Sequence, residues 1–522
     1  MNAKPLVAAA SAISGVWRLA AWLMLAALAA VLAWRGVDFA VRLVEAILYP
    51  FELDYGEGIV LQQALLITGP HAYGDITREP FIVFHYPPVY LLVVRAVAAL
   101  GVDIIVAGRA VSALASLALL ALVFLAAYRL IGDTAPPRAR AFGALAGALL
   151  VAAAAPFAHW APFARVDMLA VAFSLGAIVL AAHAGGSPLR LHGAVLLAVA
   201  AVFTKQTSIA ASVAIVLALL LTRPRRGIAA MISGLAAGLV IALAAIWLTD
   251  GGFLLHLVLY NVNRFAISTI VGQLVLLMLF GGGVYALQAG LALALGARRL
   301  LGSGWTAAAR RVALGDRPQA LLLLMLAIGF CVSTALLALT GKRGSSVNYA
   351  IEWFALSGPL IGLLIAWMAT PSLPGRAGAD AAVPPVTPML AVLALPFLLF
   401  GPRGDEVPHD AAGRAARAAL VEEIRAAPLP VISDDMVLLL RAGRTVPWEP
   451  AIFAELAQTG IWDERLIVDR IRARRFAFIL TDGERGERLF DSRYNPAVAQ
   501  AIAEAYPRRE RRAGLVMHRP SN

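Results

Sequence analysis

Residues 50–58 read Pro-Phe-Glu-Leu-Asp-Tyr-Gly-Glu-Gly and come shortly after the first long apolar segment of the chain. They place three carboxylates, those of Glu52, Asp54 and Glu57, close to a segment that is long enough to cross a membrane. A carboxylate beside a bilayer is costly unless water, a cation or a function compensates its charge. The stretch therefore predicts a helical membrane protein with a polar, chemically active loop after its first helix.

The composition supports a membrane location. Of the 522 residues, 61% are hydrophobic and 15% are charged, whereas a soluble globular domain is about half apolar and about a quarter charged. We therefore predict a polytopic α-helical membrane protein. The single cysteine excludes a disulfide framework and a thiolate metal site. The net charge of +12 lies largely in short loops between apolar runs, which indicates membrane topology and argues against a nucleic-acid partner.

The apolar segments predict about eleven membrane-spanning helices, because roughly 20 apolar residues cross a bilayer. They lie near residues 16–34, 107–130, 141–157, 166–185, 190–206, 207–222, 227–248, 271–296, 318–340, 351–370 and 387–402. The first is long enough to be an uncleaved helix instead of a signal peptide. A further apolar stretch at 89–100 follows Pro87 and Pro88 and is too short to span, so we expect an interfacial helix there.

Lysine and arginine are distributed unevenly between alternate loops. The loops expected on one side carry thirteen of them and the short loops expected on the other side carry five. Because cytoplasmic loops are enriched in these residues, we predict a cytoplasmic N-terminus and a C-terminus on the outer side. The expected location is a bacterial inner membrane, with residues 403–522 in the periplasm.

The composition changes near residue 403, which we take as a domain boundary. Residues 1–402 form the predicted membrane core, with an outer first loop at 48–106, and residues 403–522 form a small C-terminal α/β domain. The tail contains 19 arginines, no lysine and 18 acidic residues. Its pattern predicts helices at 409–427, 449–458, 463–474 and 495–505, with strands at 428–433, 476–481 and 514–518.

Asp54 and Glu57 are the first candidates for chemistry. Their spacing, with Gly56 and Gly58 between and after them, allows a tight turn in which both carboxylates face one cavity. A carboxylate in such a position can take a proton from a hydroxyl or amine as that group attacks a sugar. The alternative is that both are solvated carboxylates at the membrane interface, as we expect for Glu52.

His85 precedes a Pro-Pro pair, which stiffens the loop and aims the side chain. A substrate contact and a hydrogen-bonded interfacial histidine both fit this pattern.

Two pairs of polar residues mark the outer ends of later helices. Arg165 and Asp167 open the fourth predicted span, and Lys205 and Gln206 interrupt the apolar sequence between the fifth and sixth. A lysine at such a depth is costly unless it reaches water or meets an anion. The anion of a lipid-linked phosphate would match Lys205, with Arg165 as a second contact and Asp167 as support for the site. Simple pairing at the membrane edge is the alternative.

Arg264 and Lys342 lie in loops predicted on the same outer side. Cations there oppose the general charge bias, so they are candidates for substrate phosphate. Surface charges at lipid headgroups would show the same pattern.

In this order and topology, these motifs resemble the GT-C superfamily of integral-membrane glycosyltransferases. The resemblance covers roughly residues 15–400 and is greatest to the branch of the protein O-mannosyltransferases and lipid A aminoarabinose transferases. It implies a polyprenyl-phosphate-linked sugar as donor, Asp54 as catalytic base and the cations as holders of the lipid phosphate. Some members need a divalent metal, so the metal stays undecided. The chain departs from the mannosyltransferase pattern of adjacent Asp-Glu, because Tyr55 follows Asp54 and the next acid is Glu57.

The predicted function is therefore sugar transfer from a polyprenyl-phosphate donor to a periplasmic glycan, lipid or protein. A transporter or flippase of lipid-linked sugar is the main alternative. Transporters place polar residues near the membrane midplane on paired, broken helices, whereas the charges here gather at one rim and no paired halves are visible. An assembly protein whose tail binds envelope partners is a third reading.

Overall fold

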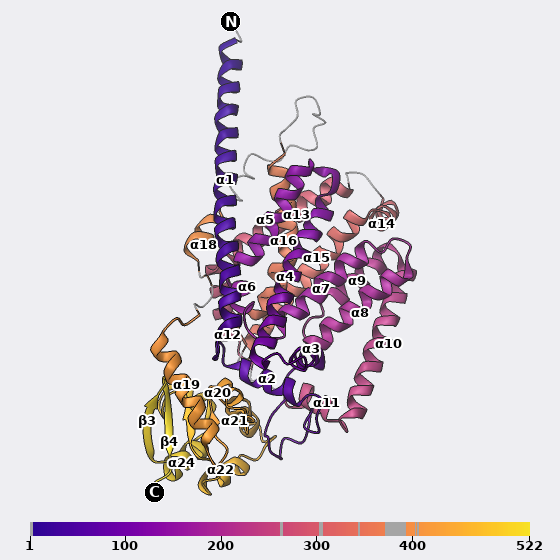
Figure 1. The fold of residues 1–522 in the computed structure, drawn as a ribbon. Helices are drawn as coiled ribbons and strands as arrows, with labels where there is room; N and C mark the ends of the chain where they lie inside the picture. The colour runs from indigo at the N-terminus through magenta and orange to yellow at the C-terminus, as the bar shows by residue number, and fades with distance from the viewer. Residues whose placement is uncertain are drawn as a thin grey trace.

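The computed structural model describes residues 4–261, 265–301, 306–342, 345–370, 393–401, 403 and 407–521. Figure 1 shows a bundle of long helices with a small unit of helices and strands at one end. The beginning of α1 and the C-terminus lie at opposite ends of the molecule. The predicted fold class, a helical membrane core with a small C-terminal α/β unit, is confirmed.

The bundle follows the predicted apolar segments closely. Its helices are α1 (Lys4–Leu48), α4 (Ile104–Ile131), α5 (Pro137–Ala153), α7 (Asp167–Ala182), α8 (Pro188–Thr204), α9 (Ala210–Thr222), α10 (Pro224–Leu248), α12 (Ile267–Leu279), α13 (Gly282–Leu301), α15 (Pro318–Leu336) and α16 (Ala350–Met368). Among the described residues, five helices are long and apolar enough to cross a membrane. Several others, including α7, α8 and α9, are apolar but shorter, so the predicted number of eleven spans is not confirmed.

Two predicted spans differ in the structure. The segment 271–296 is not one helix, because α12 and α13 meet at an angle of 76°. Gly281 lies at the break with φ +85°, a backbone conformation that other residues rarely adopt. The last predicted span, 387–402, lies largely outside the described residues, and its described part contains only the short helix α18 (Leu395–Phe400).

Close backbone contact holds the centre of the bundle together. A side chain on Gly147 of α5 would lie 2.5 Å from the carbonyl oxygen of Gly358 in α16, so the two helices touch through their backbones. Gly143 and Gly362 meet in the same way one turn further along. Small residues of this kind let membrane helices approach closely.

Between α1 and α4, the first loop forms two short helices. These are α2 (Gly56–Leu66) and α3 (Pro88–Ala98), the second of which begins at the Pro-Pro pair as predicted. With 11 residues, α3 is too short to cross a bilayer. It packs against α2 and α4 at the end of the bundle.

The C-terminal unit contains a four-stranded sheet in the order β1-β2-β4-β3. The strands are β1 (Ile432–Ser433), β2 (Ile479–Thr481), β3 (Arg508–Arg512) and β4 (Leu515–Arg519), and only the β1–β2 pair is parallel. The helices are α19 (Ala411–Ala426), α20 (Met436–Arg441), α21 (Pro450–Gln458), α22 (Arg465–Arg472), α23 (Arg488–Arg493) and α24 (Pro496–Ala505). The sequence did not predict α20, α23 or β3. The exposed edge strand β3 consists of charged residues, which discourage pairing with another strand.

The C-terminal unit is docked onto the first loop. The backbone N–H of Phe81 donates to the carbonyl of Pro447 at 2.8 Å, and the Trp462 indole N–H donates to the carbonyl of Ile76 at 3.0 Å. Gly58 of α2 makes this approach possible, because a side chain there would lie 2.5 Å from the Cβ of Met436. The first loop and the C-terminal unit therefore form one continuous surface, although the boundary at 402/403 stays a prediction.

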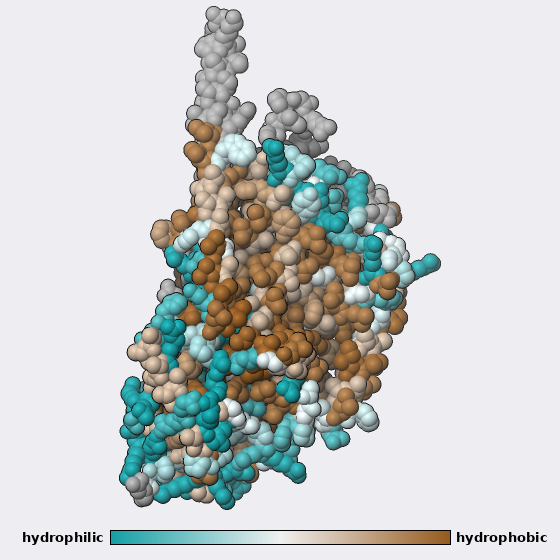
Figure 2. Space-filling view, viewed as in Figure 1, coloured by the Kyte–Doolittle hydropathy of each residue, from teal (hydrophilic) through white to brown (hydrophobic). Residues whose placement is uncertain are grey.

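The surface reflects this division. Figure 2 shows hydrophobic residues over the middle of the helical bundle, with polar residues over the C-terminal unit and again at the opposite end. This distribution fits a multi-pass membrane protein with a polar face on each side of the bilayer.

Candidate functional site

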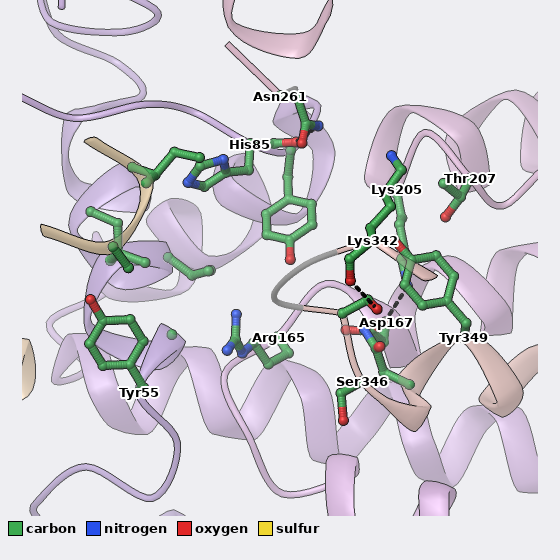
Figure 3. Close-up of a pocket in the computed structure, with 18 of the residues that line it drawn as sticks. Tyr55, His85, Arg165, Asp167, Lys205, Thr207, Asn261, Lys342, Ser346 and Tyr349 are labelled. Carbon is green, nitrogen blue, oxygen red and sulfur yellow. Dashed lines mark hydrogen bonds and ion pairs between the residues drawn. The ribbon is translucent and has the colours of Figure 1, made fainter. Parts of the chain in front are cut away.

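A polar cavity of about 290 Å³ lies where the bundle, the first loop and the C-terminal unit meet. Figure 3 shows that the labelled side chains point into it from several segments of the chain. The ionisable residues that line it are Tyr55, Tyr86, His85, Arg165, Asp167, Lys205, Lys342, Tyr349, Glu449 and Glu455. The cavity thus collects most of the predicted site residues, although they are far apart in the sequence.

Arg165 is fixed in the cavity wall by Asp54. Its Nε donates to Asp54 Oδ2 at 2.7 Å, and a second guanidinium nitrogen pairs with the same oxygen. Burial lowers the pKa of Arg165, but Asp54, Tyr86 and Asp167 together raise it above its ordinary value, so the guanidinium stays charged. Gly56 leaves room for this contact, because any side chain there would collide with the guanidinium. Asp54 itself is 19% exposed and lies beside Arg165, outside the set of lining residues.

Lys205 is held in a similar way by Asp167. Lys205 lies at the break between α8 and α9, and its Nζ is 2.6 Å from Asp167 Oδ1 at the start of α7. The side-chain amide of Asn348 donates to the same oxygen at 3.0 Å, and Nζ lies 4.4 Å from the centre of the Tyr349 ring. Asp167 thus holds Lys205 and Asn348 in place, and its predicted role in supporting the site stays a prediction.

Of the two other cations predicted for the site, Lys342 and Arg264, the structure describes only Lys342. Lys342 lines the cavity, and among the described residues no carboxylate forms an ion pair with it. Arg264 lies outside the described residues, so the prediction for it stands as made.

The loop that carries His85 is held at four successive backbone groups. Gln63, Gln206 and Tyr73 donate to the carbonyls of Val83, His85 and Tyr86. The N–H of Phe84 donates to His256 Nδ1, and all four distances are 2.7–3.0 Å. Burial lowers the pKa of His256 to about 4, so its Nδ1 is free to accept at neutral pH. Gln206 therefore lines the cavity and also fixes the loop, while the His85 ring is aimed into the cavity.

Glu449 and Glu455 were not predicted as site residues. Both come from the C-terminal unit, Glu449 directly before α21 and Glu455 within it. Glu449 Oε2 lies 3.3 Å from His85 Nε2. The sequence contains a weak signal at Glu449, which precedes Pro450 at a predicted helix start, but nothing in it shows that this helix folds back onto residues 81–85.

Glu57 does not face the cavity, so the expectation that Asp54 and Glu57 share one is wrong. Its carboxylate is fully buried and pairs with Arg109 of α4 through two contacts of 2.8 and 2.7 Å. It also accepts the backbone N–H groups of Leu53 and Ala164 at 2.9 Å. A carboxylate closed off in this way cannot reach a substrate. The geometry therefore assigns Glu57 to holding the first loop on the bundle.

Arg109 is a residue that the sequence reading missed. Its remaining N–H groups donate to the carbonyls of Ala46, Tyr49 and Phe51 at 2.6–2.8 Å, so all five guanidinium donors are used. An arginine inside the predicted span 107–130 was the available signal, because a charge at such a position needs a partner.

Glu52 is also placed differently from a solvated carboxylate, since it lies against Asp435 of the C-terminal unit. Burial and the charge of Asp435 raise the pKa of Glu52 well above its ordinary value, and burial raises the pKa of Asp435 to about 6. The folded protein binds the proton of Asp435 more tightly than the unfolded chain does, so this protonation stabilises the fold. The stabilisation is fully present below about pH 4 and is lost as the pH rises through about 6.

We therefore expect the docked C-terminal unit to be more stable at pH 5 than at pH 7. Asp435→Asn should reduce this difference and stabilise the protein at pH 7 by on the order of 2 kcal/mol, because one pKa unit corresponds to about 1.4 kcal/mol. Asparagine keeps the cap that Asp435 provides to the N–H of Leu438. Thermal unfolding of both proteins at the two pH values measures the effect, and an undiminished pH difference in the variant would contradict it.

In the part of the chain that the structure describes, no group of three or more His, Cys, Asp or Glu side chains is placed to hold a metal ion. Two cations of the cavity, Arg165 and Lys205, are instead paired with the carboxylates of Asp54 and Asp167.

No family model matches the chain, and no curated protein matches it in sequence. Solved structures do match. The crystal structure of ArnT from Cupriavidus metallidurans bound to undecaprenyl phosphate has a TM-score of 0.56 and 16% identity, over 93% of this chain and 98% of that one. The apo structure of the same protein gives 0.54 and 16%, over 93% and 97%. The archaeal oligosaccharyltransferase AglB from Archaeoglobus fulgidus, in complex with an inhibitory peptide and a dolichol-phosphate, is more distant, with a TM-score of 0.45 and 11% identity over 86% of this chain and 69% of that one.

The likeness to ArnT extends over nearly the whole of both chains. It shows that this protein shares the fold of ArnT, which agrees at the level of architecture with the resemblance drawn from the order of the sequence motifs.

Proposed function

We propose that this protein transfers a sugar from a polyprenyl-phosphate carrier to an acceptor on the outer side of a bacterial inner membrane. The observation that carries the proposal is the convergence of Arg165, Lys205 and Lys342 on one cavity at the end of the helical bundle. A lipid-linked phosphate is an anion that reaches such a position from the bilayer. The ArnT structure with the same fold contains undecaprenyl phosphate, which supports this choice of ligand.

The cations would act on the phosphate as it leaves. In a direct displacement, the acceptor oxygen bonds to the anomeric carbon while the bond from that carbon to the phosphate oxygen breaks. Negative charge then grows on the phosphate, and fixed cations stabilise it without rearranging. Arg165 and Lys205 are fixed by Asp54 and Asp167, whereas Lys342 brings a positive charge that no described carboxylate balances.

Asp54, predicted as the base, has its carboxylate bound to Arg165. We propose that it contributes to transfer as a positioning residue, by aiming the guanidinium at the phosphate. The charge bias of the loops supports a cytoplasmic N-terminus and a periplasmic cavity. The acceptor would be a periplasmic glycan, lipid or protein.

Asp54→Asn is expected to lower transfer at least 100-fold while the protein still folds, because Arg165 loses its fixed orientation. The measurement uses the full-length protein in lipid nanodiscs with a panel of synthetic undecaprenyl-phosphate sugars, and follows release of undecaprenyl phosphate. Asp38→Asn, which alters an ion pair with Arg42 in α1, is the matched control. An unimpaired Asp54→Asn protein would remove Asp54 from the mechanism.

The same preparation tests the function as a whole. In sealed vesicles with an envelope extract as acceptor, the proposal predicts new glycosidic bonds on a glycan, lipid or protein. Movement of the donor across the membrane without a new bond would instead establish the transporter reading.

A further inference from the structure

The cavity has two chemically different sides. Figure 3 shows Lys205, Lys342 and Tyr349 on one side and His85 with Tyr55 toward the other. The second side is completed by the C-terminal unit through Glu449, Ile452 and Glu455. If the cations receive the phosphate of the donor, the side near His85 is left for the acceptor.

Building on the proposed function, we propose that His85, held by Glu449, takes the proton from a hydroxyl group of the acceptor. The step is balanced within the site. The acceptor oxygen bonds to the anomeric carbon, the electron pair of the broken carbon–oxygen bond leaves with the lipid phosphate, and the hydroxyl proton passes to the His85 ring. Glu449 then stabilises the imidazolium that forms, as a carboxylate does beside a histidine base.

The carboxylates considered first are already occupied. Asp54 binds Arg165, Asp167 binds Lys205 and Asn348, and Glu57 is enclosed with Arg109. All three carboxylates therefore already have partners that donate hydrogen bonds to them.

The contact between His85 and Glu449 fits this role. Their Nε2 and Oε2 atoms are 3.3 Å apart, and the side chains are 19% and 7% exposed. When Nε2–H donates to the carboxylate, Nδ1 keeps its lone pair, and no hydrogen bond links Nδ1 to any described residue. Titratable neighbours of the ring are Glu449, the neutral His256 and the phenol of Tyr86. The ring is therefore held at one nitrogen and available at the other.

The pair is also rigidly built. Phe81 and Trp448 form a bridge of parallel β type, with the Phe81 N–H bonded to the Pro447 carbonyl, and this anchors the loop that carries His85 to the segment that precedes α21. Gln206 and Asn261 both donate to the His85 carbonyl, at 3.0 and 3.4 Å. Supporting contacts of this kind keep a reacting group within the narrow range of geometry that catalysis needs.

The position of this pair also defines the acceptor class. A base is needed only if the nucleophile loses a proton as it attacks, which holds for a hydroxyl and not for a phosphate or carboxylate. Glu449 and Glu455 place negative charge on the same wall, which disfavours an anionic nucleophile. This disfavours an anionic acceptor and leaves a neutral hydroxyl or amine, of which the proposal takes the hydroxyl of a carbohydrate, a lipid or a serine or threonine side chain.

His85→Gln should lower kcat by 10²- to 10⁴-fold, the usual contribution of a general base, while the affinity for undecaprenyl phosphate stays the same. The assay uses the full-length protein in nanodiscs with an undecaprenyl-phosphate sugar that the wild-type protein turns over. The pH profile of kcat/KM should also differ between the wild-type protein and the variant, because the variant lacks the imidazole.

Three further variants separate chemistry from structure. His85→Ala should regain part of its activity when free imidazole is added, and Glu449→Gln should show a smaller fall in kcat without loss of donor binding. Glu504→Gln, a carboxylate paired with Arg472 on the surface of the same unit, is the control and should be unaffected.

The outcomes are distinct. A wild-type protein that is inactive on every donor would overturn the proposed function itself. An active wild-type protein with an equally active His85→Gln variant would overturn the inference and leave the function intact. Loss of activity together with loss of undecaprenyl phosphate binding, without rescue by imidazole, would show that His85 is structural and would also overturn it.

Discussion

Glu57→Gln is expected to destabilise the protein by about 3–5 kcal/mol, the typical result of removing one partner of a buried ion pair. The change leaves the Arg109 guanidinium buried without its counter-charge, at a point where it also binds three backbone carbonyls at the end of α1. Because these contacts fix the first loop on the bundle, we expect loss of folded protein and a sharply lower melting temperature in detergent.

Asp54→Asn provides the comparison, since it makes the same chemical change three residues earlier. The Asp54 carboxylate is partly exposed and pairs with Arg165 at the cavity, so this variant should keep its melting temperature and lose transfer. The two variants thus separate a carboxylate that maintains the fold from one that serves the site. A Glu57→Gln protein with the wild-type melting temperature would refute the structural role of the Glu57–Arg109 pair.

Lys205→Met is expected to reduce transfer by about 10²- to 10³-fold, which corresponds to the removal of one fixed charge from a developing anion. The steady-state rate of undecaprenyl phosphate release measures the effect. Lys205 also balances Asp167, so the single variant leaves a carboxylate that is 3% exposed with only Asn348 as a partner. Some loss of stability is therefore expected as well.

Two controls distinguish these effects. Lys205→Met combined with Asp167→Asn removes both charges, so it should recover stability without recovering transfer. Lys342→Met should lower transfer and leave stability unchanged, because Lys342 forms no ion pair with a described residue. Normal transfer in the double variant would show that Lys205 serves only to neutralise Asp167.

Local sequence patterns predicted most of the helices because apolar length and proline position act over short distances. The start of α3 at Pro88 and the separation of α8 from α9 at Lys205 both follow from such local signals. The bend between α12 and α13 was missed because the apolar run continues through Gly281. Hydrophobicity alone does not show that the backbone bends at a glycine.

The site was predicted in part. Lys205 was predicted from its apolar surroundings, Arg165 and Lys342 from their positive charge on the outer side, and His85 from the prolines that follow it. The structure brings all four to one cavity. The direction in which each carboxylate points could not be predicted, since Glu57 turns toward an arginine that lies 52 residues away. In the same way, the approach of Glu449 to His85 joins residues 364 positions apart. Such contacts depend on how the C-terminal unit docks, which no local pattern records.

The docking of α21 over the cavity has an evolutionary consequence. Lys205 and Lys342 belong to segments of the helical bundle, whereas Glu449, Ile452 and Glu455 belong to the C-terminal unit. If the cavity has the proposed function, mutation can remodel the C-terminal unit and change the acceptor while the residues proposed to bind the lipid phosphate stay unchanged. Related proteins would then differ in their acceptors and share one kind of lipid carrier, because the two sides of the cavity come from separate parts of the chain.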